Sequence, residues 1–216
     1  MAEQVSKYTH LIWDFNGTIL DDVGLGVNSV NTMLEARGLS VIPSIERYRE
    51  IFGFPIREYY RGLGFDFEAE DYEGELAPEW VALYSAGEKH CPLYDGVRET
   101  LAEVAARGVP QLIISAAQQG QLRSQLEARG ILDRFEAVYG LGDFLAKSKE
   151  SIVRAWRAEH PDARPLFVGD TTHDAEVADA IGADCVLFCG GHQSATRLSV
   201  CGKPIITAIP ELLNYL

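Results

Sequence analysis

The second part of the chain alternates short apolar segments with helical ones, and this alternation restricts the possible folds more than any other feature. From Pro92 onward, five apolar runs are separated by segments with helical spacing that end at glycine or proline. The apolar runs span residues 111–114, 137–139, 166–168, 185–188 and 205–206. Short strands that alternate with helices predict right-handed βαβ units and a mostly parallel sheet. We therefore expect an α/β fold.

A further apolar run near the start, residues 10–13, breaks at Asp14 into polar residues and a glycine. A parallel strand that ends on a carboxylate places it at the edge where open α/β sheets bind ligands. Asp14 and Asn16 are two positions apart on an extended segment, so their side chains are expected to point the same way. Gly17 permits a turn in which backbone amides approach an anion, and Thr18 offers a hydroxyl. The alternative is a strand end with ordinary turn-forming residues.

The segment between this first strand and Pro92 has a different character. Its apolar residues recur at helical spacing up to stop signals at Gly38, Gly53 and Gly64, and no strand pattern occurs in it. A helical block inserted after a first strand suggests a cap over the carboxyl edge of the sheet. The predicted organisation is an α/β core formed by residues 1–20 and 90–216, with an inserted all-helical cap at 21–89.

The charge balance excludes one class of partner. The chain of 216 residues has 19 Lys and Arg against 32 Asp and Glu, a net charge of -13, and such a surface repels nucleic acid. A small phosphorylated substrate remains compatible with it where cations converge locally. The chain shows no signal segment, no bilayer-spanning run and no CxxC pair among its four cysteines. We therefore expect a cytoplasmic monomer or homodimer with no membrane partner.

Three of the predicted strands end in polar residues of matching kind. Asp14 and Asn16 follow the first strand, Ser115 follows the run at 111–114, and Asp170 with Asp174 follows the run at 166–168. Parallel strands bring these ends to one edge, and the spacing of four lets both later carboxylates face one point as a helix begins. Clustered carboxylates repel each other unless a cation is present, and ligands that are all oxygen favour Mg²⁺.

A lysine is expected beside these carboxylates to offset their charge, and Lys147 and Lys149 both follow the run at 137–139. Each residue of the cluster also has an ordinary explanation. The two later aspartates could begin a helix, Ser115 could be a helix N-cap, and either lysine could be exposed to solvent. The ordered co-occurrence of all of them is more specific than any single residue.

Four motifs in this order resemble the haloacid dehalogenase-like (HAD) hydrolase superfamily, whose pattern is DxDGT, then Ser or Thr, then Lys, then GDxxxD. The motifs are DFNGTILDD at 14–22, LIIS at 112–115, AKSK at 146–149 and VGDTTHD at 168–174. The size and the helical insertion look like the phosphoglycolate phosphatase and β-phosphoglucomutase branch. The resemblance implies a Rossmannoid parallel sheet with the Asp14 strand central, and a Mg²⁺-dependent phosphatase of a small phosphomonoester.

The resemblance also implies a role for each motif residue. Asp14 would be the nucleophile that forms an aspartyl-phosphate, and a lysine would offset the charge between nucleophile and phosphate. Lys149 fits the spacing of the phosphoserine phosphatases. Lys147 fits the spacing of relatives with a KPxP motif, but the sequence contains no KPxP, so we prefer Lys149. The expected catalytic residues are Asp14, Asn16, Ser115 and Lys149. The expected phosphate-binding residues are Gly17, Thr18, Ser115, Ala116 and Lys149. The expected metal ligands are Asp14, the Asn16 carbonyl, Asp170 and Asp174.

The chain departs from the family pattern at Asn16, where the related phosphatases usually carry an aspartate that acts as general acid and base. An amide can donate a hydrogen bond but cannot transfer a proton at neutral pH. General acid–base catalysis is typically worth ~10²–10⁴-fold. We therefore expect a preference for aryl or acyl phosphates over alkyl phosphates, with His173 and His192 as candidates to supply the missing proton.

Other functions are compatible with parts of the pattern. A phosphonoacetaldehyde hydrolase also lacks the second aspartate but needs a cap lysine, and residues 22–86 contain none. A 2-haloacid dehalogenase uses no metal, which argues against it because GDTTHD is intact. The non-enzyme alternative is a catalytically weakened relative that binds a phospholigand or a protein partner.

Substrate choice is expected to lie in the insertion, where arginines and tyrosines could reach a second anionic group. These residues are Arg47, Arg49, Arg57, Tyr59, Tyr60 and Arg61, and the alternative for most of the arginines is an exposed position on a helix surface.

Overall fold

Six parallel strands form the centre of the computed structural model, which describes residues 7–142 and 149–216. Their order across the sheet is β3-β2-β1-β4-β5-β6, so β1 lies between β2 and β4. The strands are β1 (His10–Trp13), β2 (Gln111–Gln118), β3 (Ala137–Leu141), β4 (Pro165–Gly169), β5 (Asp184–Phe188) and β6 (Ile205–Ile206). The predicted α/β fold, with the Asp14 strand central in a parallel sheet, is confirmed.

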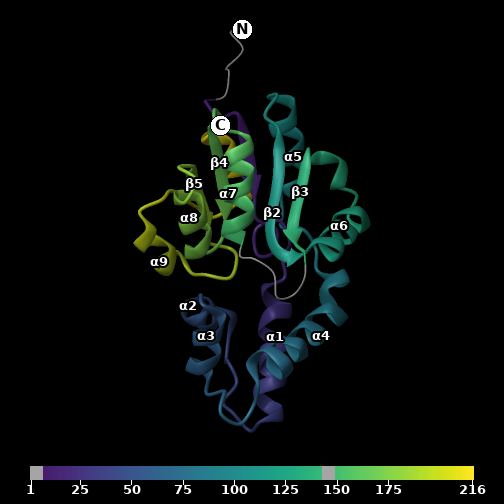
Figure 1. Ribbon diagram of the computed structural model, residues 1–216, viewed down its shortest axis with the longest axis vertical. Coiled ribbons are helices and arrows are strands. Elements are labelled where there is room, and N and C mark those ends of the chain that lie inside the picture. The colour runs from purple at the N-terminus through teal and green to yellow at the C-terminus, as the bar shows by residue number, and fades with distance from the viewer. Residues whose placement is uncertain (1–6, 143–148) are drawn as a thin grey trace.

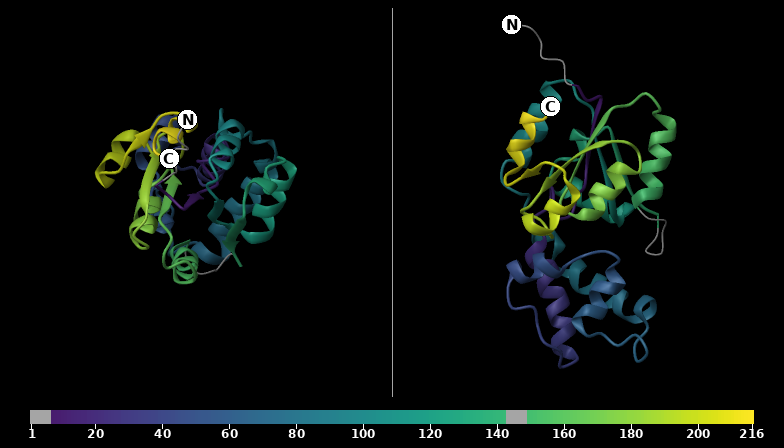
Figure 2. Two further views of the ribbon diagram at one scale, coloured as in Figure 1. Left: turned by 90° about the horizontal axis from the view of Figure 1, so that it is seen from above. Right: turned by 90° about the vertical axis from the view of Figure 1, so that its left-hand side faces the viewer.

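Helices cover both faces of the sheet, and the alternation of side chains along β1 explains why. Leu11 and Trp13 are buried with α5 (Val97–Ala106) and α6 (Gln119–Ala128) on one face. Ile12, which points the other way, is buried with α7 (Lys149–Glu159) and α8 (Thr172–Asp179). A strand that is apolar on both sides is typical of a parallel sheet covered on both faces. Figure 2 shows these layers from two further directions.

Four helices lie together beyond the carboxyl ends of the strands (Figure 1). They are α1 (Val23–Ala36), α2 (Ile45–Ile51), α3 (Ile56–Leu63) and α4 (Ala77–Gly87), with a π-helical turn at Tyr72–Leu76. We call residues 23–87 the helical block. It buries an apolar cluster of its own, which includes Met33, Leu34, Tyr60 and Leu76. The block contains no strand, as expected. Its extent as a separate cap domain, residues 21–89, stays a prediction.

Short elements complete the chain. They are α9 (Ala195–Leu198) and 3₁₀ turns at Glu88–His90, Leu132–Arg134, Ser199–Cys201 and Ile209–Asn214. Within the described ranges, no helix combines the length and the apolar character needed to cross a lipid bilayer.

Some strand boundaries differ from the predicted apolar runs, for example at β3, which continues to Leu141. The second core strand was expected to end before Ser115, yet β2 continues to Gln118 through two alanines that fit a strand. Its ladder with β3 is irregular between Ile114 and Gln118, so the regular pairing does stop next to Ser115. Helix α7 begins at Lys149, which places this lysine on a helix that packs against the sheet.

Candidate active site

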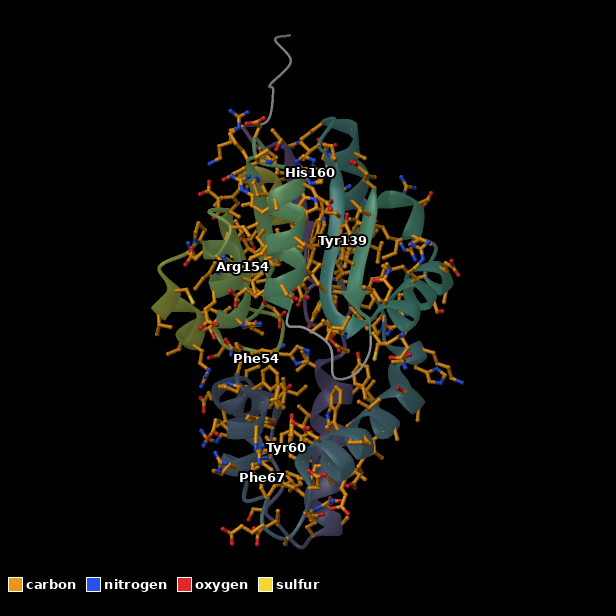
Figure 3. The ribbon with its side chains drawn as sticks, viewed as in Figure 1. Phe54, Tyr60, Phe67, Tyr139, Arg154 and His160 are labelled. Carbon is orange, nitrogen blue, oxygen red and sulfur yellow. The ribbon has the colours of Figure 1, made fainter. Side chains whose placement is uncertain are left out.

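The predicted site residues meet where the sheet faces the helical block. Asp14 directly follows β1, Ser115 lies on β2, and Asp170 directly follows β4. These three neighbouring strands run in parallel, so their carboxyl ends open on the same cavity of about 420 Å³. The helical block forms the other side of this cavity, and Figure 3 shows Phe54 at the end of the block that faces the sheet. The edge predicted from the sequence is therefore the floor of this cavity.

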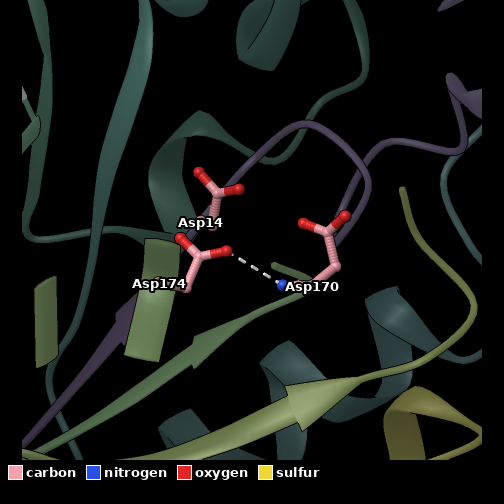
Figure 4. Close-up of side chains that lie close together, drawn as sticks. All are labelled: Asp14, Asp170 and Asp174. Carbon is pink, nitrogen blue, oxygen red and sulfur yellow. Dashed lines mark hydrogen bonds between the residues drawn. The ribbon is translucent and has the colours of Figure 1, made fainter. Parts of the chain in front are cut away.

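Three buried carboxylates lie together on this floor (Figure 4). One oxygen atom from each of Asp14, Asp170 and Asp174 lies within 4.8 Å of the others. Asp174 is fixed by hydrogen bonds to its Oδ2 from the backbone N–H of Asp170 (3.1 Å) and of Thr171 (2.9 Å). Asp170 accepts from the Thr18 hydroxyl at 3.0 Å and from the backbone N–H of His192 at 2.6 Å. Each carboxylate is therefore held in place by its surroundings.

Lys149 is the cation of this cluster. Its Nζ lies 2.8 Å from Oδ1 of Asp14 and 2.5 Å from Oδ1 of Asp174, and its side chain is only 4% exposed. Burial alone would lower the pKa of Lys149, but Asp14 and Asp174 together raise it above its ordinary value. Of the two candidate lysines, Lys149 is thus brought to the carboxylates, and Lys147 lies outside the described residues.

The carboxylates carry more negative charge than this lysine balances. Burial, opposed by Lys149 and assisted by Asp174, raises the pKa of Asp14 to about 6. Burial, opposed by His192 and assisted by the neighbouring carboxylates, raises the pKa of Asp170 to about 8. The donors converging here are all oxygen atoms, which suits a hard cation such as Mg²⁺. The residues present therefore fit the metal that the sequence implies.

The loop after Asp14 is shaped by a glycine. Gly17 has a φ of +71°, and a Cβ atom at this position would collide with Asp170 and His192. Only glycine lets the loop approach the carboxylates this closely. Thr18 is fully buried, and its hydroxyl donates a hydrogen bond to Asp170, so it positions that carboxylate. The expected contact of Thr18 with phosphate stays a prediction.

Ser115 is also buried, and its Oγ accepts a hydrogen bond from the backbone N–H of Ala117 at 3.1 Å. Ser115 and Ala116 both line the cavity, on the side opposite the helical block. This placement agrees with the predicted phosphate-binding role, which itself remains untested.

Asp22 is a member of the site that the sequence analysis missed. It is 1% exposed, and its Oδ2 accepts hydrogen bonds from the Asn16 amide (2.8 Å) and the Tyr84 hydroxyl (2.6 Å). Its Oδ1 accepts from the backbone N–H of Gly17 at 2.8 Å. Although burial opposes it, the contacts with His192, Tyr84 and Asn16 lower the pKa of Asp22. The side-chain amide of Asn16 thus donates a hydrogen bond to the Asp22 carboxylate. An ionised aspartate at position 16 could not donate this hydrogen bond.

A signal for Asp22 existed in the sequence but has a common alternative meaning. The residue stands at the N-cap position of α1, where aspartate is frequent. Its side chain makes no capping hydrogen bond there, because its oxygen atoms are used in the site instead.

The two candidate histidines have different surroundings. His192 is buried with its Nε2 3.3 Å from Oδ1 of Asp22, and its Nδ1 lies 2.9 Å from the Tyr48 hydroxyl of α2. Burial opposes protonation, but Asp22 raises the pKa of His192 to about 9. His173 lines the cavity but has its Nδ1 3.2 Å from Glu176 and its ring against Phe54. Of the two, His192 is therefore the one in contact with the Asn16–Asp22 pair.

Comparison with known proteins identifies the family. The sequence model of the protein family described as haloacid dehalogenase-like hydrolase matches residues 11–188, a range that includes all four motifs. The chain belongs to this family. The sequence-based recognition and the expected HAD-type hydrolase class are thereby confirmed.

Curated relatives are identical to the chain at between a quarter and a third of the aligned positions. A Mycobacterium tuberculosis protein named tyrosine-protein kinase PtkA is 29% identical over 91% of this chain and 67% of the relative. A phosphoglycolate phosphatase of Pseudomonas fluorescens is 28% identical over 94% of this chain and 75% of the relative. Proteins with two different named activities thus resemble this chain to the same degree.

Solved structures support the fold. A haloacid dehalogenase-like family hydrolase from Streptococcus pneumoniae superposes with a TM-score of 0.80 at 18% identity, covering 100% of this chain and 99% of that one. The structure of M. tuberculosis PtkA gives a TM-score of 0.78 at 24% identity, covering 97% and 98%. The HAD-like α/β fold expected from the motifs is confirmed by these likenesses.

Proposed function

We propose that this protein is a Mg²⁺-dependent phosphatase that hydrolyses a small phosphomonoester through an aspartyl-phosphate on Asp14. The observation that carries the proposal is the setting of Asp14, a buried carboxylate that ends the central strand, pairs with Lys149 at 2.8 Å and lines the cavity. Family membership and the likeness to phosphoglycolate phosphatases support the same reaction class.

In the first half-reaction the Asp14 carboxylate attacks the phosphorus atom, and the bond from phosphorus to the leaving oxygen breaks. Lys149 offsets the negative charge of Asp14 as the phosphate approaches, and the Ser115 hydroxyl and the Ala116 N–H bind phosphoryl oxygens. Asp14, Asp170, Asp174 and the Asn16 carbonyl would hold Mg²⁺. When bound, the ion supplies charge stabilisation for phosphoryl transfer.

In the second half-reaction water attacks the phosphorus atom of the aspartyl-phosphate and releases Asp14. The attacking water must lose a proton, and the amide of Asn16 has no basic atom to accept it. For aryl or acyl phosphates, whose leaving oxygen needs little protonation, we therefore expect hydrolysis of the intermediate to be slower than its formation, so that phosphorylated protein accumulates during turnover.

The same feature favours a second candidate function, transfer of the phosphoryl group from Asp14 to an acceptor hydroxyl other than water. A long-lived aspartyl-phosphate would leave time for such an acceptor to bind. The likeness to a protein named as a tyrosine kinase is compatible with this alternative.

The test is phosphate release from a panel of phosphomonoesters with and without Mg²⁺, combined with acid quenching to trap phosphorylated protein. Asp14→Asn should lose both signals, whereas the matched control Asp133→Asn, at an exposed position, should keep them. Wild-type rates in Asp14→Asn would exclude the aspartyl-phosphate mechanism. Phosphorylated protein that releases phosphate only when an acceptor is added would favour transfer over hydrolysis. Absence of turnover and of phosphorylated protein would favour a catalytically weakened binding protein.

A further inference from the structure

The cavity above Asp14 has walls built mainly from aromatic side chains of the helical block. They include Phe52, Phe54, Tyr59, Tyr60, Tyr72 and Trp80. The rings support one another, with Phe52 edge-on to Tyr59 at 5.3 Å between centroids and Trp80 stacked on Tyr84 at 4.8 Å. Figure 3 shows Phe54 near the sheet and Tyr60 deeper in the block, so aromatic walls extend away from the carboxylates. A group attached to the phosphate would lie between these rings.

The same cavity has little to offer a negatively charged group. Among the described residues that line it there is no arginine, and its single lysine, Lys149, is already paired with Asp14 and Asp174. Two further acidic side chains, Asp22 and Glu88, line the cavity as well. The protonated His192, which also lines the cavity, is paired with Asp22 at 3.3 Å. Among the described lining residues, a carboxylate on the substrate would therefore meet like charges and find no unpaired cation.

The arginines considered as partners for a second anion make their contacts elsewhere. Arg47 pairs with Glu50 at 3.1 Å on the surface, and Arg61 pairs with Glu58. Arg49 donates to the backbone carbonyls of Gly190 and Gly191, which ties α2 to the loop that carries His192.

Arg57 lies over the rings of Phe67 and Tyr72, at 5.1 and 5.8 Å from their centroids. It is absent from the cavity lining, as are the other three arginines. Of the residues proposed from the sequence to select the substrate, Tyr59 and Tyr60 are the ones that reach the cavity.

The size and polarity of the cavity restrict the class of ligand further. A volume of about 420 Å³ is within the usual range for a drug-sized ligand and exceeds the needs of a two-carbon acid. The hydroxyl of Tyr59 is buried and has no hydrogen-bond partner among the described residues. A buried polar group without a partner is costly, so a neutral hydrogen-bonding substituent on the ligand would satisfy it.

We infer that the substrate is a phosphate ester of an uncharged aromatic alcohol or phenol, whose ring occupies the aromatic cavity while its phosphate lies against Asp14 and Lys149. This inference rests on the proposed phosphatase function and adds the substrate class. The ring stacks on the aromatic side chains of the helical block that line the cavity. Because the leaving group is neutral, Asp22 and Glu88 do not repel it. The pocket, and not only the reactivity of the ester, then selects the substrate.

The test separates pocket binding from leaving-group chemistry by using esters of primary alcohols with nearly the same acidity. Benzyl phosphate, ethyl phosphate and 4-carboxybenzyl phosphate are compared with 2-phosphoglycolate in the presence of Mg²⁺. We expect kcat/KM for benzyl phosphate to exceed that for ethyl phosphate by roughly 10- to 100-fold, the effect of burying one aromatic ring. The carboxylated ester and phosphoglycolate should both fall well below benzyl phosphate. A preference for either carboxylated compound would overturn the inference.

Two variants localise the effect. Phe54→Ala removes a cavity wall at a position that is 43% exposed, and it should reduce the benzyl-to-ethyl ratio by roughly 2- to 10-fold. Phe67→Ala truncates an aromatic residue of the same block that does not line the cavity, and it should keep the wild-type ratio. Equal ratios in the two variants would contradict the placement of the ring.

Calorimetric binding of the phosphonate isosteres makes the result independent of turnover. Tighter binding of the benzyl isostere than of the ethyl isostere supports the aromatic pocket even if no ester is hydrolysed, in which case only the proposed function fails. Equal affinities would overturn the aromatic inference even if both esters are hydrolysed.

Discussion

Lys149→Met is the substitution whose effect follows most directly from the structure. Methionine has a similar length, so it fills a similar space while removing the charge that lies 5.1 Å from the centroid of the Phe167 ring. Asp14 and Asp174 then remain buried without the cation that lies 2.8 and 2.5 Å from them. Lys203→Met is a matched control, because Lys203 also forms a 2.5 Å ion pair, with Asp179, whose side chain is 62% exposed.

The two substitutions should differ several-fold in their effect on stability. Breaking a buried pair costs about 3–5 kcal/mol because a buried charge is left uncompensated. An exposed pair contributes at most about 1 kcal/mol. For a chain of 216 residues, the larger loss corresponds to a fall in Tm of about 6–20 °C and the smaller to about 2–4 °C.

Urea and thermal unfolding followed by tryptophan fluorescence, with EDTA present, measure this difference. Adding Mg²⁺ should raise the Tm of Lys149→Met more than that of the wild type, because the ion replaces part of the missing positive charge. If Lys149→Met loses no more stability than Lys203→Met, the buried lysine does not compensate the carboxylates, and the electrostatic account of the site is wrong.

Four further substitutions test individual parts of the site. Asp14→Asn should lower kcat by about 10⁴-fold or more while the unfolding midpoint stays near that of the wild type; unchanged phosphate release would rule out Asp14 as the nucleophile. Asn16→Asp should speed turnover of alkyl phosphates, by up to ~10²-fold, but should lower stability because two carboxylates then meet at Asp22. Asp22→Asn in the same chain should recover that stability, and additive effects in the double-mutant cycle would mean that the two side chains do not interact. Tyr84→Phe removes a hydroxyl bonded to Asp22 at 2.6 Å and should cost about 1–3 kcal/mol in urea unfolding, so a neutral result would contradict that hydrogen bond.

Most of the fold was predictable because it follows from local patterns. The apolar strands, the glycine stops between them and the all-helical insertion are each encoded within about a dozen neighbouring residues. The extension of β2 to Gln118 was missed because two alanines carry little preference for strand or loop. The choice of Lys149 over Lys147 was made through the family spacing, and the burial of Lys149 follows from the packing of α7 on the sheet.

The carboxylate floor of the site was predictable for the same reason, since its residues stand where strands end. The network around Asp22 was not, because it depends on how the helical block packs on the sheet. Tyr84 comes from 62 residues further along the chain, and Tyr48 lies 144 residues before His192. The orientation of the block also decides that its tyrosines line the cavity while its arginines do not, and periodicity carries no information on such docking.

The central position of β1 has a consequence for biosynthesis. Leu11 pairs with Gln111 on one side and with Leu166 on the other, 100 and 155 positions later in the chain. One edge of this apolar strand therefore stays unpaired until β2 has been made and the other until β4 has been made, whereas the helical block can form from neighbouring residues. Chains that stop before β4 expose one edge of this strand permanently, and unpaired apolar edges associate with one another. Premature termination between β2 and β4 should therefore yield aggregates rather than a soluble fragment of the core.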